Sequence, residues 1–268
     1  MDITHPRQIS VHGIALETLQ ISGPAERPTL VFLHEGLGSV ALWRDWPQKL
    51  CQRLGLPGLV YSRQGYGQSE PRPDVRGEPR RVNGVAHGRL QPDYMHHEAR
   101  VVLPELLRQL GIVRPVLLGH SDGGTIALLH ASQHPVAGCI VMAPHVIVED
   151  ISVKAIAEAR EAYLNGSLRQ RLAAFHADVD CAFWQWNDAW LNPAFRCYDI
   201  RPELTTITAP LLAIQGEGDA YGTLAQIDAI ALKVPHTRLV KLTDCGHSPH
   251  RDQPEAVAQA IEQFIAAL

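Results

Sequence analysis

Long apolar runs, a strong excess of one charge and paired cysteines are all missing from this 268-residue chain. No apolar run approaches the roughly 18 to 20 residues needed to span a bilayer. Lys and Arg number 24 against 28 Asp and Glu, and the net charge of −4 argues against a surface for nucleic acid or membrane. The hydrophobic share of 46% excludes disorder, collagen and coiled coil for the whole chain. We therefore expect a globular protein without a nucleic-acid or membrane partner, its oligomeric state left open.

Cysteine is scarce and its spacing is irregular. The five cysteines are an odd number and include no Cys-x-x-Cys pair. The first residues, Met1 to Arg7, contain no apolar segment typical of a signal peptide. We therefore expect reduced thiols in a cytoplasmic protein. The thiols in question are Cys51, Cys139, Cys181, Cys197 and Cys245.

Clusters of metal ligands are also missing from the sequence. The close histidine pairs, His96 with His97 and His247 with His250, lack the additional Cys, His or Asp residues that a zinc site needs. The sequence therefore predicts neither a metal nor a cofactor.

What the chain does contain is an alternation of short apolar runs and amphipathic stretches. Two antiparallel strands are expected in the first 22 residues, around a turn at His12 and Gly13. Further strands are expected at 29–34, 58–61, 115–119, 138–143, 210–214 and 237–242, and helices at 40–54, 94–110, 125–134 and 255–268. This alternation predicts an α/β fold with a mostly parallel sheet that helices cover on both faces. In such sheets ligands bind beyond the carboxyl ends of the strands.

Two segments interrupt the alternation. Residues 70–91 are rich in Pro, Gly and Arg and predict a long loop; its arginines could meet a carboxylate or a CoA-bearing substrate, and a solvated loop is the alternative. Residues 144–203 have a mainly helical pattern without a strand, and predict a helical lid. The core domain would then be 1–143 and 204–268. Aromatic residues in the lid, including Trp184, Trp186 and Trp190, are candidates to line an apolar substrate pocket, or form the lid's own core.

The sharpest motif is Gly-x-Ser-x-Gly at residues 119–123, between an expected strand and an expected helix. A strand-to-helix turn this tight strains the central backbone and brings its neighbours close, so positions 119 and 123 need residues without a β-carbon. The turn exposes the Ser121 hydroxyl beside the free N–H groups of the helix start. A plain glycine-rich turn is the alternative interpretation.

A serine hydroxyl needs a base, and the base needs an orienting acid. Asp219 follows the strand at 210–214, and His247 follows the strand at 237–242. Because each of the three residues follows a different strand, all three can converge at one edge of the sheet. Glu217 and Asp244 are rival candidates for the acid.

At these residues the chain resembles the α/β-hydrolase superfamily, over essentially its whole length, including valacyclovir-hydrolase-like and meta-cleavage-product hydrolase-like members. The resemblance implies an eight-stranded, mostly parallel sheet with a helical lid inserted after strand six. It also implies Ser121 as nucleophile, His247 as general base and then acid, and Asp219 as the residue that orients the imidazolium. The turn at 61–69 is similar to a scaffold motif of the family.

Residues 34–39, His-Glu-Gly-Leu-Gly-Ser, resemble the family's oxyanion loop. By that resemblance the N–H groups of Gly36 and Asp122 form the oxyanion hole, and Glu35, at a usual glycine position, leaves the register open by one residue. The carboxylate of Asp122 must either be paired or meet a cationic substrate group. Backbone N–H groups are the expected partners.

These observations predict a cofactor-free serine hydrolase that acts on a small-molecule substrate, a carboxylic ester or related acyl compound, through an acyl-enzyme. The first alternative is hydrolysis of a C–C bond in a meta-cleavage-type dienoate. The second is a non-catalytic small-molecule receptor on the same scaffold. Dehalogenases and epoxide hydrolases of this fold are disfavoured because they carry aspartate at the position of Ser121.

Overall fold

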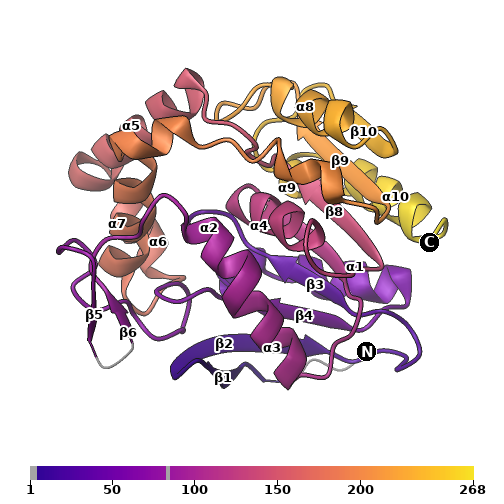
Figure 1. Ribbon diagram of the computed structural model, residues 1–268, viewed down its shortest axis with the longest axis horizontal. Coiled ribbons are helices and arrows are strands. Elements are labelled where there is room, and N and C mark those ends of the chain that lie inside the picture. The colour runs from indigo at the N-terminus through magenta and orange to yellow at the C-terminus, as the bar shows by residue number, and fades with distance from the viewer. Residues whose placement is uncertain (1–4, 83–84) are drawn as a thin grey trace.

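The computed structural model describes residues 5–82 and 85–268, and its centre is an eight-stranded sheet (Figure 1). The strand order is β1-β2-β4-β3-β7-β8-β9-β10. Strand β2 runs antiparallel to β1 and β4, and the other neighbours are parallel. The strands are β1 Arg7–Val11, β2 Ile14–Ile21, β3 Leu30–Leu33, β4 Gly58–Tyr61, β7 Val116–His120, β8 Gly138–Met142, β9 Leu211–Gly216 and β10 Thr237–Leu242. The expected mostly parallel eight-stranded sheet is confirmed, with each of its strands at the expected place.

Helices cover both faces of the sheet, and the two cores follow the alternation of side chains along each strand. In β3, Leu30 and Phe32 pack with helices α1 (Trp46–Leu54) and α10 (Pro254–Ile265). Val31 and Leu33 face the opposite side, where helices α3 (Leu103–Gln109), α4 (Asp122–Ala131) and α8 (Ala225–Lys233) pack. Because both faces are buried, the central strands are apolar throughout rather than alternating.

The expected helices are present, with interruptions that the apolar spacing does not reveal. The segment 40–54 divides into a 3₁₀ turn, Ala41–Trp43, and α1, because Arg44 between them adopts a positive φ of 55°. The segment 94–110 contains α2 (Tyr94–His97), a π-helical turn (Glu98–Val102) and α3. Helix α8 and a short α9 (Pro249–Asp252) were not expected from the sequence.

The segment 70–91 is not wholly a loop, so this expectation was wrong in part. It carries a two-stranded antiparallel pair, β5 (Arg80–Val82) and β6 (Val85–His87). Residues 83–84, which belong to the same expectation, lie outside the described residues. Strand β5 is fully exposed and begins with two arginines, so it has no apolar face for a sequence pattern to display.

The segment 144–203 leaves the sheet after β8, its sixth strand in chain order, and returns before β9 (Figure 1). It contains α5 (Asp150–Asn165), α6 (Leu168–Ala173), α7 (Val179–Trp190) and a 3₁₀ turn, Pro193–Cys197. An isolated antiparallel bridge joins Ile147 to Asp199, so the two ends of the segment lie side by side. We call this segment the helical insertion. Among residues 5–82 and 85–268, no helix combines the length and apolar character that crossing a bilayer requires.

A buried histidine in α4 gives the fold a pH dependence. The ring Nδ1 of His130 lies 2.9 Å from the carbonyl oxygen of Ala99 and therefore donates to it. Burial lowers the pKa of His130 to about 4, against the opposing effect of this hydrogen bond. The unfolded chain takes up a proton at this residue below about pH 6.5 and the folded chain does not until about pH 4, so the stability it confers is present at neutral pH and is lost between these values.

We predict that His130→Asn, whose amide can still donate to Ala99, flattens the dependence of stability on pH. The wild type should lose roughly 2 kcal/mol more than the variant between about pH 7 and about pH 5. Urea unfolding at both pH values measures the difference. The same exchange at the exposed His5 is the matched control, and equal losses in all three proteins would contradict the prediction.

Candidate active site

The turn from β7 into α4 has the strained geometry expected of the Gly-x-Ser-x-Gly motif. Ser121 lies between the two elements with φ 53° and ψ −119°, a conformation that favours glycine. A β-carbon on Gly119 would lie 2.1 Å from the carbonyl oxygen of Gly123. One on Gly123 would lie 2.0 Å from the carbonyl oxygen of Leu33, in the neighbouring strand β3. Both glycines are therefore required by close backbone contacts, and the elbow packs directly against the loop that follows β3.

Ser121, His247 and Asp219 come together at the carboxyl ends of β7, β10 and β9. The Nε2 of His247 lies 3.0 Å from Ser121 Oγ, and its Nδ1 lies 2.9 Å from each carboxylate oxygen of Asp219. A carboxylate only accepts, so Nδ1 carries the proton and the lone pair of Nε2 faces the serine hydroxyl. The rival acids, Glu217 and Asp244, are exposed. The structure thus brings Asp219, and not these two acids, to His247, and its role as the acid remains a prediction.

The carboxylate of Asp219 is held in its ionised form. It also accepts hydrogen bonds from the backbone N–H of Tyr221 at 2.8 Å and from the side-chain amide of Gln215 at 3.2 Å. Burial raises its pKa, but the hydrogen bond and charge of His247 and the Tyr221 N–H outweigh burial, so the pKa of Asp219 is lowered overall. At neutral pH the group is therefore an acceptor that can orient His247 and stabilise its imidazolium.

The two expected oxyanion donors come from different segments. Asp122 is the first residue of α4, where a backbone N–H has no partner within the helix. Gly36 belongs to the loop after β3, and a β-carbon there would lie 2.1 Å from the indole nitrogen of Trp186. The loop is thus covered by the helical insertion. The assignment of Gly36 rather than a neighbouring amide remains a prediction.

The buried side chain of Asp122 is paired, but not with the backbone N–H groups that were expected. The hydroxyl of Tyr94 donates to one carboxylate oxygen at 2.6 Å, and the indole of Trp190 donates to the other at 3.2 Å. The guanidinium of Arg63 lies 3.8 Å away. Burial raises the pKa of Asp122, and Arg63, Tyr94 and Trp190 oppose that effect. Because three side chains already engage this carboxylate, it is not a free partner for a substrate cation.

The three tryptophans of α7 have different surroundings. Trp190 contacts Asp122, and its ring lies 4.8 Å from that of His145. Trp186 packs on Gly36. Trp184, in contrast, lies under the guanidinium of Arg76, 3.8 Å from the ring centroid. Trp186 and Trp190 therefore contact the expected oxyanion residues, whereas Trp184 contacts Arg76 of segment 70–91 and side chains within the insertion. The role of the three tryptophans as substrate contacts remains a prediction.

Most arginines of segment 70–91 are engaged within the protein, which favours the solvated-loop interpretation over a substrate site. Arg76 forms an ion pair with Asp188 of α7 at 2.8 Å, and Arg80 forms one with Asp74 at 2.6 Å. Arg89 pairs with Glu78, and Arg72 donates to the carbonyl of Gly88 at 2.5 Å. These contacts leave little free positive charge in the segment for an anionic substrate.

Sequence reasoning missed the other rings around His247. The rings of Tyr221, His120 and His145 lie 4.7, 5.2 and 5.8 Å from it. Burial lowers the pKa of His145 to about 3, so this residue is neutral near the triad at physiological pH. Of these three rings, only that of His120, within the Gly-x-Ser-x-Gly motif, carried a positional signal in the sequence.

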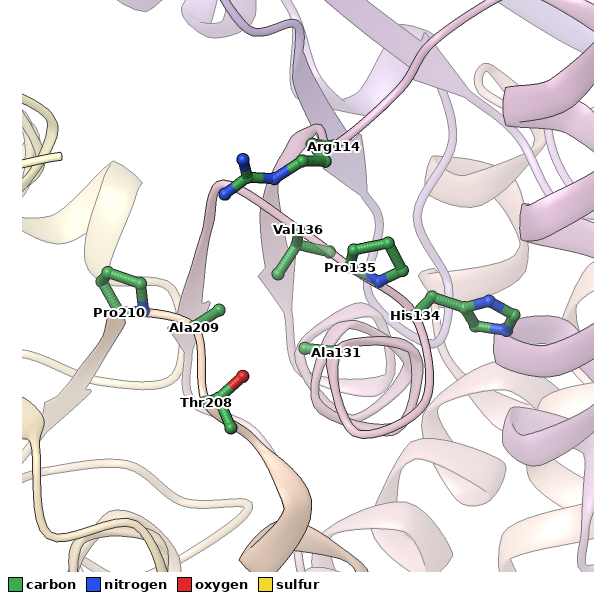
Figure 2. Close-up of a pocket in the computed structure, with 8 residues that line it drawn as sticks. All are labelled: Arg114, Ala131, His134, Pro135, Val136, Thr208, Ala209 and Pro210. Carbon is green, nitrogen blue, oxygen red and sulfur yellow. The ribbon is translucent and has the colours of Figure 1, made fainter.

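A surface pocket of about 300 Å³ lies elsewhere (Figure 2). Its lining includes Arg114, Val136 and Pro210, which precede β7, β8 and β9. These positions are the amino ends of the strands, whereas the triad is at the carboxyl ends. Figure 2 shows the pocket walled mostly by alanine, proline and valine side chains. In the part of the chain that the structure describes, no group of three or more His, Cys, Asp or Glu side chains could hold a metal ion.

With this geometry in place, comparisons with known proteins identify the family. A model described as the alpha/beta hydrolase family matches residues 30–260. The chain belongs to the alpha/beta hydrolase family. It is therefore an enzyme of the hydrolase type, and the expected fold and family are confirmed.

Individual relatives are distant and have different names. The chain is 24% identical to the sn-1-specific diacylglycerol lipase ABHD11 of Mus musculus, over 92% of this chain and 83% of that protein. It is 27% identical to the 2-succinyl-6-hydroxy-2,4-cyclohexadiene-1-carboxylate synthase of Enterobacter sp., over 89% and 92%. The solved carboxylesterase CesB from Bacillus subtilis superposes with a TM-score of 0.71 at 20% identity, covering 100% of this chain and 93% of that one. At that identity the structural likeness shows the fold alone.

The strain at Ser121 generates a stability prediction. Ser121→Gly and Ser121→Ala both remove the hydroxyl, but only glycine adopts the observed backbone conformation without strain. We expect the glycine variant to be about 1 kcal/mol more stable than the alanine variant, because relief of roughly 1 to 3 kcal/mol of strain exceeds the entropy cost of glycine in the unfolded state. Denaturant unfolding of the two variants measures the difference. An alanine variant at least as stable as the glycine variant would contradict a strained elbow.

Proposed function

We propose that the protein is a serine hydrolase of a small carboxylic ester or a related acyl substrate. The observation that carries this proposal is the hydrogen-bond chain from Ser121 Oγ through His247 to Asp219, at 3.0 and 2.9 Å. The hydroxyl of Ser121 lies on a strained turn at the start of helix α4. There the nucleophile, the base and the free backbone N–H groups can act on one carbonyl group.

The proposed reaction has two halves. Ser121 Oγ attacks the carbonyl carbon while His247 Nε2 takes its proton, and Asp219 stabilises the imidazolium. The N–H groups of Asp122 and Gly36 donate to the carbonyl oxygen as it becomes negative. The imidazolium then gives its proton to the leaving alkoxide, which leaves an acyl-enzyme on Ser121. A water molecule, deprotonated by His247, releases the acid by the same route.

We further propose that the helical insertion, residues 144–203, acts as a cap domain on a core formed by 1–143 and 204–268. In its helix α7, Trp190 donates a hydrogen bond to the side chain of Asp122, and Trp186 packs beside Gly36. Two aromatic side chains therefore lie next to the residues proposed as oxyanion donors. Apolar rings beside the reacting carbonyl suit a small acyl group of low polarity. A cytoplasmic location and the absence of a cofactor remain part of this proposal.

Hydrolysis of a C–C bond is the second candidate. Its support is that a relative aligned with 89% of the chain is named a carboxylate synthase rather than an ester hydrolase. A substrate panel of short esters, thioesters, lactones and a 2-hydroxy-6-oxo-dienoate separates the two. The proposal expects the highest kcat/KM among the esters, and a preference for the dienoate would replace it with C–C hydrolysis.

The decisive variant is Ser121→Ala. Without the nucleophile, kcat for a p-nitrophenyl ester should fall roughly 10⁶-fold, to the level that binding and oxyanion donors alone provide. A fluorophosphonate probe should label the wild type and not the variant. Ser132→Ala, at the end of the same helix, is the matched control and should behave as the wild type. If the Ser121→Ala variant turns over the ester as fast as the wild type, Ser121 is not the nucleophile. A wild-type protein that neither hydrolyses esters nor takes the label favours the receptor alternative.

The orienting acid can be tested against its rival. Asp219→Asn replaces the acceptor for His247 Nδ1–H by an amide and favours the wrong tautomer, so kcat should fall about 10⁴-fold. Glu217→Gln makes the same change at the exposed acid two residues earlier and should leave kcat unchanged. Steady-state kinetics with the same ester measure both variants. The opposite ranking would transfer the role to Glu217.

A further inference from the structure

His120, the residue before the proposed nucleophile, holds the loop of the proposed base. Its side chain is 1% exposed at the end of β7. The ring Nε2 lies 2.6 Å from the backbone carbonyl oxygen of His247. A carbonyl oxygen only accepts hydrogen bonds, so Nε2 of His120 must carry a hydrogen and donate it. The contact joins two residues that are 127 positions apart, and His120 directly precedes Ser121, the proposed partner of His247.

The other ring nitrogen of His120 faces a carboxylate. Nδ1 lies 3.5 Å from Oε2 of Glu35, whose side chain is 16% exposed. The carboxylate thus lies against the side of the ring away from His247, where it limits how the ring of His120 can rotate.

Other groups also face the pair. Burial raises the pKa of Glu35, but His120, Arg251 and His250 outweigh burial and hold that pKa well below its usual range, so the carboxylate is ionised. Arg251 of α9 lies 3.6 Å from the other carboxylate oxygen. His250 packs on His120 with ring centroids 5.0 Å apart, and burial lowers the pKa of His250 to about 2, so His250 is neutral.

Glu35 is itself fixed to the loop that follows β3. Its carboxylate occupies the space beside Gly38, where a β-carbon would lie 2.5 Å from Oε2. Its backbone carbonyl accepts hydrogen bonds from the N–H of Gly38 at 3.0 Å, from the ring of His34 at 2.7 Å and from Arg63 at 3.2 Å. The side chain of Glu35 thus connects a rigid oxyanion loop to His120, and His120 connects to the loop of His247.

We propose that Glu35 and His120 form a positioning pair for the reaction, in which the carboxylate fixes the orientation of the His120 ring so that its Nε2–H holds the backbone of His247 in register with Ser121. The inference rests on the proposed function, because it gives His247 the role of base. It also accounts for the glutamate at a position of the loop where the resemblance leads one to expect glycine.

Two matched pairs of variants test the proposal. His120→Phe keeps a ring in the cavity and removes the donor, whereas His120→Gln keeps a donor at the position of Nε2. Glu35→Ala removes the group that fixes the orientation of the ring, whereas Glu35→Gln keeps a polar side chain of the same size, which can donate to Nδ1 while Nε2 still donates to His247. All four are compared with the wild type in kcat and KM for the p-nitrophenyl ester, with circular dichroism to verify folding.

The proposal expects a loss in kcat of about 10- to 100-fold for the phenylalanine and alanine variants, as for a small misplacement of a catalytic group. KM should change less than about threefold, because the ester contacts neither residue. The glutamine variants should each recover most of kcat. A folded His120→Phe protein with the kcat of the wild type overturns the proposal, and so does a folded His120→Gln protein as slow as His120→Phe.

The second pair decides the matter where the first does not fold. If His120→Phe is unfolded, equal kcat values for Glu35→Ala and Glu35→Gln overturn the proposal, and a tenfold or greater advantage of glutamine supports it. Failure of the proposed function is seen separately, in proteins unchanged at both positions. Ester turnover that survives Ser121→Ala removes the role of His247 and this proposal with it.

Discussion

The tight turn from β7 into α4 is the constraint on which the rest of the site depends. Ser121 is held in a backbone conformation that costs a non-glycine residue of the order of 1 to 3 kcal/mol. The surrounding structure maintains it because the backbone of Gly123 lies against the carbonyl of Leu33 and that of Gly119 against Gly123. The same contacts bring the start of α4 to the loop after β3. One strained residue thus determines where the hydroxyl, the helix N–H groups and the oxyanion loop lie relative to one another.

Buried charge is arranged around this turn in pairs. Arg63, 5% exposed, donates to the carbonyl of His34 at 2.7 Å and to that of Glu35 at 3.2 Å, and lies 3.8 Å from Asp122. A single guanidinium therefore fixes the loop after β3 and compensates the carboxylate that follows the nucleophile. A buried charge without such a partner would cost several kcal/mol. Arg63 and Asp122 thus offset each other's charge beside the nucleophile turn.

The sequence was sufficient where one local signal determines the structure. Apolar runs bounded by Gly and Pro located each strand of the main sheet, and the strand-to-helix turn at 119–123 located the serine. The order of Ser121, Asp219 and His247 after three strands predicted their meeting, because parallel strands present their carboxyl ends at one edge. These expectations needed no knowledge of side-chain packing.

Expectations that depend on contacts between distant segments were less successful. The strands β5 and β6 pair with each other at an exposed edge, without an apolar alternation to reveal them. The partners of Asp122 come from α2 and α7, and nothing in the residues next to Asp122 indicates them. Trp184 lies in the same helix as Trp186 and Trp190. It nevertheless faces Arg76 rather than the loop that follows β3. A 3.6-residue period determines which face each tryptophan occupies, but not what that face meets.

Helix α7 therefore contacts both of the residues that are expected to bind the oxyanion. Trp190 donates to the carboxylate of the residue after Ser121, and Trp186 fills the space beside Gly36. Both elements that would bind the oxyanion thus have one side made by the insertion, while Asp188 of the same helix holds Arg76 and Arg160 at 2.8 Å each. Because the insertion contacts the side chain of Asp122 and the space beside Gly36, the proposed function requires that a change in the packing of α7 act on the chemical step as well as on which substrate is accepted.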